Sequence, residues 1–299
     1  MSPPGRPKGE YRRPQAEGTP VNPPRRPDGE PHGPVPPGRG PEKPPPDETE
    51  AVAARYARRG DPDRYSALRP EVWQTLQERQ RTLLRLLAAH GVRDCGGLNL
   101  VEVGCGAGGN LLELLRLGFA PERLRGIELL PARFEIARRV LPAAVRLDCG
   151  DACAVPVAPA SQDLVLAATV FSSILDGAFQ QRLAAAIWSW LKPGGAVLWY
   201  DFALDNPHNP DVRGVPLQRL RALFADGRID ARRVTLAPPL ARAACRLHPA
   251  LYPVLNALPL LRTHRLAWIG KPAFEPFAAR AGVTTSDRQV DALRDAEGI

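Results

Sequence analysis

The segment VEVGCGAGGN, residues 101–110, decides how the chain is expected to fold. An apolar strand-like stretch runs directly into Gly104, Gly106, Gly108 and Gly109, and a helix-like stretch follows. Glycine permits a tight turn and lets a ligand approach the backbone closely. The first N–H groups of the following helix have no partner within that helix. In an open α/β sheet, ligands bind at the carboxyl ends of the strands, so this turn is the candidate binding site.

Strand-like and helix-like segments alternate on both sides of this turn. The strands are expected at residues 98–103, 124–127, 145–147, 164–169 and 196–202, with weaker signals at 232–236 and 266–270. The helices are expected at residues 68–89, 110–117, 131–140, 179–191 and 216–224, and Pro193-Gly194-Gly195 is expected to end the fourth. This alternation predicts an α/β fold: a Rossmann-like, doubly wound, seven-stranded, mainly parallel sheet with helices on both faces.

Composition divides the chain of 299 residues into three parts. Of its 34 Pro, sixteen fall in residues 1–49, together with seven Gly. A segment with so few large apolar residues cannot offset its ordering entropy, so we expect a disordered leader over 1–49. Residues 50–271 carry the apolar pattern of one folded domain, and residues 272–299 lose it, which predicts a loose C-terminal tail.

Charge, hydropathy and cysteine content argue against several classes of protein. The net charge of +8 is spread over the chain without a run of five like charges, so no nucleic-acid partner is expected. No stretch is apolar enough for a transmembrane span, and no signal peptide opens the chain. Five cysteines in no zinc-binding pattern predict reduced thiols, no metal site and a cytoplasmic location.

Two classes of cofactor use such a glycine turn. A dinucleotide site needs G-x-G-x-x-G, which Gly104, Gly106 and Gly109 supply, and an acidic residue about 20 positions later, where Glu128 stands. An S-adenosylmethionine site is favoured by Glu102 before the first glycine and by Asp151 after the third expected strand. The stretch LKPGG, residues 191–195, before the fifth expected strand also favours the second class.

These motifs resemble those of the class I S-adenosylmethionine-dependent methyltransferases, in particular the methyltransferase type 11-like group, strongly over residues 98–202. The resemblance implies that Glu102 and the glycines hold the methionine part of the cofactor, that Glu128 binds the ribose hydroxyls, and that Asp151 meets the adenine amino group. Asp148, three residues earlier, is the alternative to Asp151 for that role. The cofactor-binding residues implied are Glu102, Gly104, Cys105, Gly106, Gly108, Glu128, Leu129, Asp151 and Ala152.

No single catalytic residue follows from these motifs. Methyl transfer from a sulfonium depends mainly on positioning and on the exclusion of water. A general base is needed only for a poor nucleophile such as a hydroxyl. Weak candidates are Tyr65 in a segment that precedes the core, Asp176 after the fourth strand and His208 after the fifth.

The expected function is methyl transfer to a small molecule or biosynthetic intermediate, and a hydroxyl is one candidate for the accepting group. A nicotinamide-dependent oxidoreductase and a non-catalytic interaction module that keeps the fold are the alternatives. The apolar segment 239–261, with Arg242, Arg246 and Arg262, is expected to be a helical cover of the sheet, to cap an acceptor pocket or to touch a membrane surface.

Overall fold

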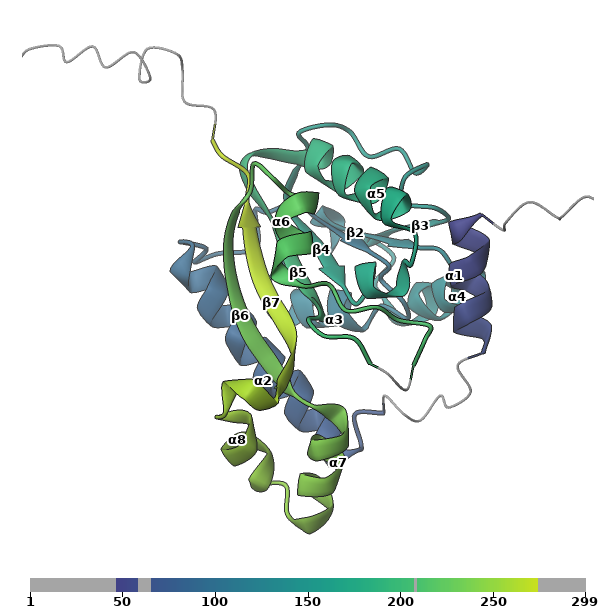
Figure 1. The fold of residues 1–299 in the computed structure, drawn as a ribbon. Coiled ribbons are helices and arrows are strands. Elements are labelled where there is room, and N and C mark those ends of the chain that lie inside the picture. The colour runs from purple at the N-terminus through teal and green to yellow at the C-terminus, as the bar shows by residue number, and fades with distance from the viewer. Residues whose placement is uncertain (1–46, 59–65, 207–208, 274–299) are drawn as a thin grey trace, which may run out of the picture. The chain divides into compact units, whose positions relative to one another are not determined.

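The computed structural model describes residues 47–58, 66–206 and 209–273. Most of the leader expected over 1–49 and most of the tail expected over 272–299 therefore lie outside the described residues. The first described element is helix α1 (Glu48–Ala57), and the last is strand β7 (Arg262–Gly270). Figure 1 shows these elements in chain order.

The centre of the domain is a seven-stranded sheet with strand order β3-β2-β1-β4-β5-β7-β6. Neighbouring strands from β3 to β5 pair in parallel, whereas β7 pairs antiparallel with both β5 and β6. The predicted α/β fold and strand number are confirmed. The prediction of a mainly parallel sheet is confirmed in part, because β7 makes the sheet mixed. The remaining strands are β1 (Leu100–Val103), β2 (Leu124–Glu128), β3 (Arg146–Cys149), β4 (Gln162–Ala168), β5 (Leu191–Phe202) and β6 (Arg228–Leu236).

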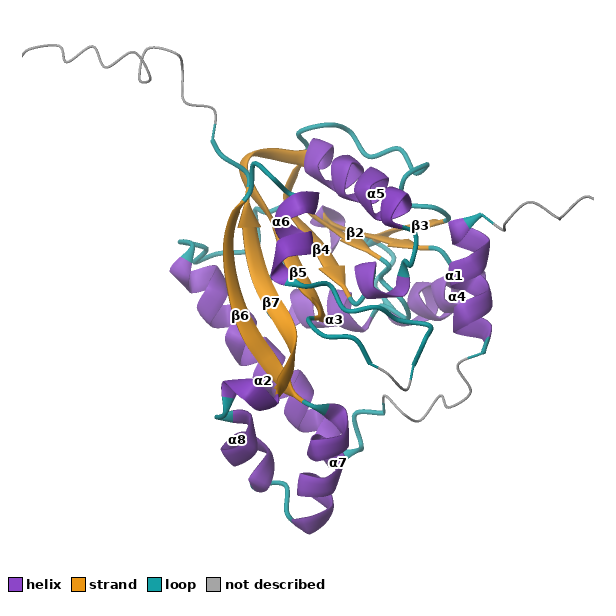
Figure 2. Cartoon of the chain, in the orientation of Figure 1, coloured by secondary structure: helices purple, strands orange, loops and turns teal. Residues whose placement is uncertain are grey.

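Helices cover both faces of the sheet, as Figure 2 shows. One face packs against α1, α5 (Gly177–Trp190) and α6 (Leu217–Leu223). The other packs against α2 (Pro70–Ala89), α3 (Gly109–Arg116) and α4 (Pro131–Val140). Side chains of a strand alternate between the two apolar cores: Val101 and Val103 of β1 enter the first and Leu100 the second. Burial on both faces explains why residues 164–168 of β4 are uniformly apolar.

The end of α5 differs from the sequence expectation. Pro193-Gly194-Gly195 was expected to end the helix, but α5 already ends at Trp190 and these residues lie within β5. Gly194 has a φ of +82°, and a side chain on Gly195 would meet the backbone oxygen of Asp163 at 2.7 Å. The glycines therefore serve a close approach of β5 to β4 at a register shift rather than a helix terminus.

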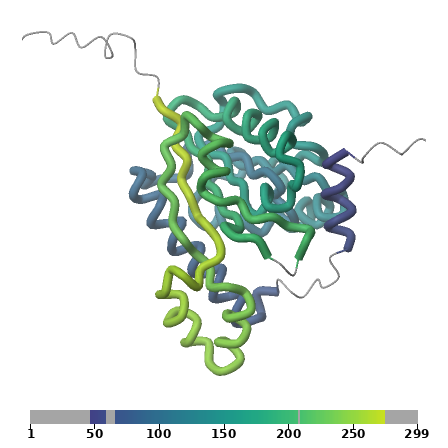
Figure 3. Tube along the Cα trace, viewed as in Figure 1, coloured from purple at the N-terminus to yellow at the C-terminus, as the bar shows by residue number. Residues whose placement is uncertain are grey.

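The connection between β6 and β7 is a helical insertion. It comprises α7 (Pro238–Leu247), α8 (Leu251–Asn256) and the 3-10 turn η4 (Pro259–Leu261). Figure 3 shows that the chain leaves the end of β6, passes through these helices and returns as β7. None of the helices in the described ranges is long and apolar enough to cross a membrane.

Candidate functional site

The glycine turn after β1 has the conformation that its sequence predicts. Gly104, Gly106 and Gly108 have φ values of +65°, +58° and +85°, which L side chains rarely adopt. A Cβ added to Gly104 would lie 2.9 Å from Cγ2 of Val170, in the loop after β4. Gly108 is the residue before α3, so the turn delivers the chain directly to the helix N-terminus. The positive φ values and the close neighbours thus explain why these positions of the turn are glycine.

Glu128, the last residue of β2, is fixed by the backbone of this turn. Its Oε2 accepts the Gly106 N–H at 2.7 Å, and its Oε1 accepts the Leu130 N–H at 2.9 Å. The residue is almost fully buried. Each carboxylate oxygen has a second lone pair, so the carboxylate keeps two acceptor positions for a ligand.

Glu102 lies within β1 and is completely buried. Its Oε1 accepts a hydrogen bond from Asn110 Nδ2 at 2.6 Å, and its Oε2 has no hydrogen-bond partner among the described residues. Arg79 of α2 donates to Oδ1 of Asn110 at 2.7 Å. Burial raises the pKa of Glu102 to about 8. The ligand-free carboxyl is therefore protonated at neutral pH, and a cationic N–H donor of a ligand at the free oxygen would favour the charged carboxylate.

Asp151 and Ala152 follow β3, beside β2. Cys149 of β3 pairs with Glu128 of β2, so the residues that follow the two strands lie at the same edge. Oδ1 of Asp151 accepts the backbone N–H of Cys153 at 2.9 Å. Asp148, the alternative, instead accepts a hydrogen bond from Arg125 Nε at 2.6 Å. The structure thus leaves Asp151 the more available of the two carboxylates.

Cys105 is a buried residue of the glycine turn. Burial, reinforced by the carboxylates of Glu102 and Glu128, raises the pKa of its thiol. A thiol that stays protonated is a poor nucleophile. Its side chain packs in the apolar core beside Leu111 and close to Gly126, so its position is that of a small apolar filler.

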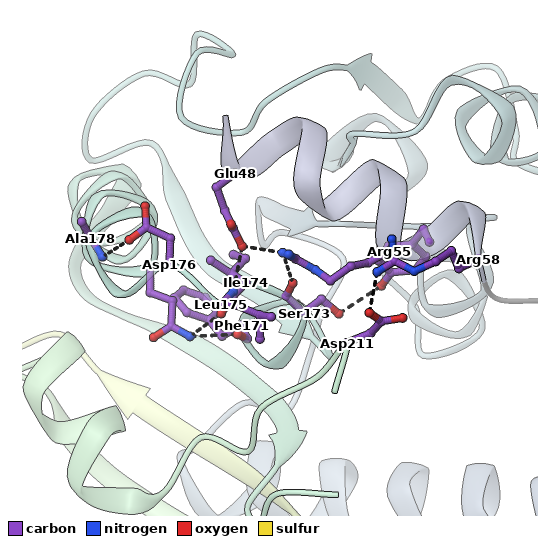
Figure 4. Close-up of polar contacts among 12 residues, drawn as sticks. Glu48, Arg55, Arg58, Phe171, Ser173, Ile174, Leu175, Asp176, Ala178 and Asp211 are labelled. Atoms are coloured by element: carbon purple, nitrogen blue, oxygen red, sulfur yellow. Dashed lines mark hydrogen bonds and ion pairs between the residues drawn. The ribbon is translucent and has the colours of Figure 1, made fainter. Parts of the chain in front are cut away.

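A buried ion pair within α1, between Glu48 and Arg55, fastens this helix to the loop after β4 through hydrogen bonds to the backbone of the loop (Figure 4). Glu48 Oε1 accepts from Arg55 Nη2 and from the Leu175 N–H, the latter at 2.7 Å. Arg55 Nη2 also donates to the carbonyl oxygen of Ser173 at 3.0 Å. In contrast, Arg58 pairs with Asp211 at 2.6 Å in an exposed position.

The same helix reaches the glycine turn through an aromatic contact. The guanidinium of Arg133, on α4, lies over the ring of Tyr56 at 5.2 Å from its centroid. A Cβ added to Gly106 would meet Arg133 Nη2 at 2.9 Å. Tyr56 and Arg133 therefore cover the turn from the outside, and α1 is in the position of a cover for the ligand site.

The carboxyl end of β5 and the start of β7, which pair with each other, carry a buried polar cluster. Asp201 accepts the Ser172 N–H at 3.0 Å and the Phe202 N–H at 2.8 Å, and burial raises its pKa to about 6. His264 stacks on Tyr200, and burial lowers its pKa to about 3, so the ring is neutral. Both carboxylate oxygens of Asp201 hold the backbone in place, which makes it a positioning residue for the loop after β4.

Of the three weak catalytic candidates, only Asp176 lies within the described residues. Asp176 is exposed, and its Oδ1 accepts the Ala178 N–H at 2.8 Å, so it caps the N-terminus of α5. Tyr65 and His208 lie outside the described residues. Sequence reasoning missed Arg79, Asn110 and Arg133 as parts of the site. The only signal available was the position of Asn110 directly after the glycines.

Comparison with known proteins matches the region that contains this geometry. Residues 100–195 match a family model described as a methyltransferase domain. The match covers about a third of the chain and includes β1, the glycine turn and the start of β5. The resemblance inferred from the motifs is confirmed, and S-adenosylmethionine, the methyl donor of this family, is confirmed as the expected cofactor. A search of curated protein sequences finds no match.

Several solved structures align with this chain at low sequence identity. The Haloferax volcanii complex of the Trm112 methyltransferase activator with a methyltransferase aligns with a TM-score of 0.50 at 18% identity, over 72% of this chain and 98% of that one. The [4+2]-cyclase SpnF aligns with a TM-score of 0.49 at 22% identity, over 66% and 83%. An S-adenosylmethionine-dependent methyltransferase of Mesorhizobium loti aligns with a TM-score of 0.47 at 16% identity, over 62% and 95%.

The residues around the glycine turn fit this cofactor. The unpartnered, buried Oε2 of Glu102 suits an ammonium group, and the remaining acceptor positions of Glu128 suit a ribose diol. The positive φ of Gly104 and Gly106 would strain a side chain at either position. The glycine turn, residues 104–109, contains no lysine for a pyrophosphate, in agreement with a cofactor that has none.

Proposed function

We propose that this protein transfers a methyl group from S-adenosylmethionine to a small-molecule or biosynthetic-intermediate acceptor, and that residues 50–271 form the domain that does so. The observation that carries the proposal is the pair of buried carboxylates around one glycine turn. Glu128 is bonded to the Gly106 N–H, and Glu102 presents a free Oε2. Such a pair suits the two ends of a cofactor that carries a diol and an ammonium group.

The cofactor-binding roles are assigned as follows. Glu102 accepts the ammonium group, Glu128 accepts the ribose hydroxyls, and Asp151 with Ala152 meets the adenine. Leu129 and the turn residues Gly104, Cys105, Gly106 and Gly108 supply backbone and shape. When bound, S-adenosylmethionine supplies an electrophilic methyl group whose leaving group is a neutral thioether. The protein then has to orient the acceptor and exclude water, for which α1 is well placed.

A base is assigned to none of the described residues. Asp201 is held by two backbone N–H groups, and His264 has a strongly lowered pKa and stacks between aromatic rings. An acceptor that is nucleophilic without a base therefore fits the described site better than an unactivated hydroxyl. Asp176 remains the described candidate for acceptor contact.

Isothermal titration calorimetry with S-adenosylmethionine and S-adenosylhomocysteine tests the proposal. We expect micromolar binding of both, and a loss of at least 100-fold in Glu128→Ala, because the carboxylate both binds the diol and holds the Gly106 N–H. Glu135→Ala, at a half-exposed site on α4, is the matched control and should bind normally. Absence of binding in the unmodified protein would refute the function. Stabilisation against heat by NAD or NADP, but not by S-adenosylmethionine, would support the oxidoreductase instead.

We propose separately that the α7–α8 insertion contacts an anionic membrane surface. Residues 231–273 contain seven basic and no acidic residues. Six of the thirteen exposed large apolar side chains of the described residues belong to this insertion: Leu240, Leu247, Leu251, Val254, Leu258 and Leu260. Apolar side chains flanked only by positive charge match a bilayer with anionic head groups. The acceptor would then be reached at or near that surface.

A further inference from the structure

A cavity lies away from the cofactor turn, between α2, β6, α8 and the start of β7. It has a volume of about 300 Å³. In the strand order, β6 is four spacings away from β1, which is on the order of 19 Å at ~4.8 Å per spacing. The cavity is therefore distinct from the glycine turn. Figure 1 shows α2 running beside β6 at this place.

The lining of the cavity is dominated by arginine. Five arginines and one glutamate contribute to it: Arg81, Arg85, Arg232, Arg233, Arg262 and Glu78. Arg232 has a carboxylate partner, Asp230, at 3.2 Å. Among the described residues, no carboxylate lies within 4 Å of Arg81, Arg85 or Arg233. Guanidinium groups gathered without counter-charges repel one another, and an anion in the cavity would remove that cost.

Glu78 does not neutralise these arginines by ion pairing. Its Oε1 and Oε2 both accept the backbone N–H of Thr235, at 3.2 and 2.9 Å. The hydroxyl of Tyr252 lies 3.5 Å from Oε2. The carboxylate is thereby bound to the backbone of β6 and to α8, and it makes no ion pair within 4 Å among the described residues. It forms part of the wall rather than a partner for the guanidinium groups.

Asn256 adds an independent observation. It is the last residue of α8, it lines the cavity, and its exposed fraction is only 7%. Its Oδ1 is buried and has no hydrogen-bond partner in the described part of the chain. A buried acceptor without a partner costs stability, so a ligand with a hydroxyl or N–H donor at this position would be stabilising. The nearby Arg262 is oriented by the carbonyl oxygens of Asn256 and Arg233, at 2.7 and 3.0 Å.

We propose that this cavity binds the phosphate group of a hydroxylated phosphate ester, of which glycerol phosphate is the simplest example. The arginines bind the phosphate oxygens, since the planar guanidinium matches phosphate in charge and geometry. The Oδ1 of Asn256 accepts from a hydroxyl beside the phosphate. The same chemistry is offered by a soluble phosphate ester and by a glycerophospholipid head group, and the experiment distinguishes these two sources.

Calorimetric titration of the full chain with glycerol 3-phosphate at fixed ionic strength tests the site. We expect saturable binding with one site per chain and a loss of at least tenfold in affinity in Arg85→Gln/Arg233→Gln. Arg138→Gln, which removes an exposed arginine on α4, should bind as the unmodified protein does. The single variant Asn256→Asp should also bind more weakly than the unmodified protein, because it places a negative charge against the phosphate. No saturable binding, or equal losses in Arg138→Gln, would overturn the proposal.

Two further measurements distinguish a failure of the phosphate site from a failure of the cofactor site and identify the source of the phosphate. Binding of S-adenosylhomocysteine should be unchanged in Arg85→Gln/Arg233→Gln, so a failure of the phosphate site is distinct from a failure of the cofactor site. Co-sedimentation with phosphatidylglycerol vesicles then identifies the source of the phosphate. Vesicle binding that glycerol 3-phosphate displaces indicates the lipid head group. Binding of the soluble ester without displacement of vesicles indicates a free ligand.

Discussion

Asn110 donates its side-chain amide to Oε1 of Glu102 at 2.6 Å, whereas Oε2 of the same carboxylate is buried without a partner in the described part of the chain. One half of the carboxylate is therefore satisfied by the protein and the other half is available to a ligand. Arg79 holds Asn110 from the other side at 2.7 Å. This arrangement keeps Glu102 oriented toward the turn at the expense of the stability of the fold.

Glu102→Gln should change the pH dependence of stability. Burial raises the pKa of Glu102 from its ordinary 4.5 to about 8, so between these pH values the folded state keeps a proton that the unfolded state has released. The free energy of unfolding of the unmodified protein is thus reduced by this group as pH rises from 4.5 to 8, by up to ~1.4 kcal/mol per pH unit. Glutamine lacks this contribution, so the variant should gain relative stability over that range.

Urea denaturation of the ligand-free protein at pH 5, 6, 7 and 8 measures the difference between the two proteins. The variant should bind S-adenosylhomocysteine more weakly although it is relatively more stable at pH 8. Glu135→Gln, at a half-exposed position, should show no such trend. A stability difference that does not change between pH 5 and pH 8 would contradict the buried, protonated state of Glu102.

Arg55→Ala should loosen α1 from the loop after β4. Arg55 is 90% removed from solvent at its side chain and bridges Glu48 to the Ser173 carbonyl. Removal of one partner leaves the Glu48 carboxylate poorly paired, which costs more than the loss of an exposed pair. We expect faster hydrogen exchange at residues 171–175 and a loss of about tenfold in cofactor affinity, because α1 carries Tyr56 toward the turn.

Arg58→Ala is the matched control on the same helix. Its side chain is 59% exposed, and its ion pair with Asp211 lies in solvent, so it should contribute less than about 1 kcal/mol. Exchange rates and cofactor affinity should therefore remain close to those of the unmodified protein. If the two variants behaved alike, the cover function of α1 would lose its basis.

The local elements and the cofactor turn could be predicted from sequence, because they depend on neighbouring residues. The helix expected at 131–140 has the same bounds in the structure, and Glu102 and Glu128 meet because β1 and β2 are parallel neighbours. The pairing of Arg55 with Ser173 could not be predicted, since the two residues are 118 positions apart and periodicity carries no information about their contact. The arginine cavity could not be predicted for the same reason, since its lining residues come from α2, β6, α8 and the start of β7.

His264→Phe should protect the protein against acid. Burial lowers the pKa of His264 from its ordinary 6.5 to about 3, so below pH 6.5 the unfolded state takes up a proton that the folded state refuses. The stability that the neutral ring contributes is present above pH 6.5 and is lost as pH falls toward 3. Phenylalanine keeps the stack on Tyr200 and Phe202 but cannot be protonated.

Denaturation at pH 7.5 and pH 4 provides the comparison. At pH 7.5 the variant should lie within about 1 kcal/mol of the unmodified protein, the expected cost of the bond between His264 and Thr263. At pH 4 it should be the more stable of the two. The exposed His248→Phe should show no gain at pH 4, and a gain of equal size there would assign the effect to a general loss of positive charge.

The α7–α8 insertion should bind anionic vesicles through its exposed leucines. Leu247 and Leu260 are 81% and 86% exposed, so each can be replaced by aspartate at little cost to the fold. Leu247→Asp/Leu260→Asp removes apolar surface and places negative charge in a segment that has none, and we expect co-sedimentation with phosphatidylglycerol vesicles to fall at least fivefold.

Ile136→Asp, an equally drastic change on an exposed position of α4, should leave co-sedimentation unchanged. Phosphatidylcholine vesicles should bind weakly throughout, since they offer the arginines no net charge. Equal binding to both lipids, or an equal loss in Ile136→Asp, would exclude the insertion as the membrane contact and point to a protein partner for the same leucines.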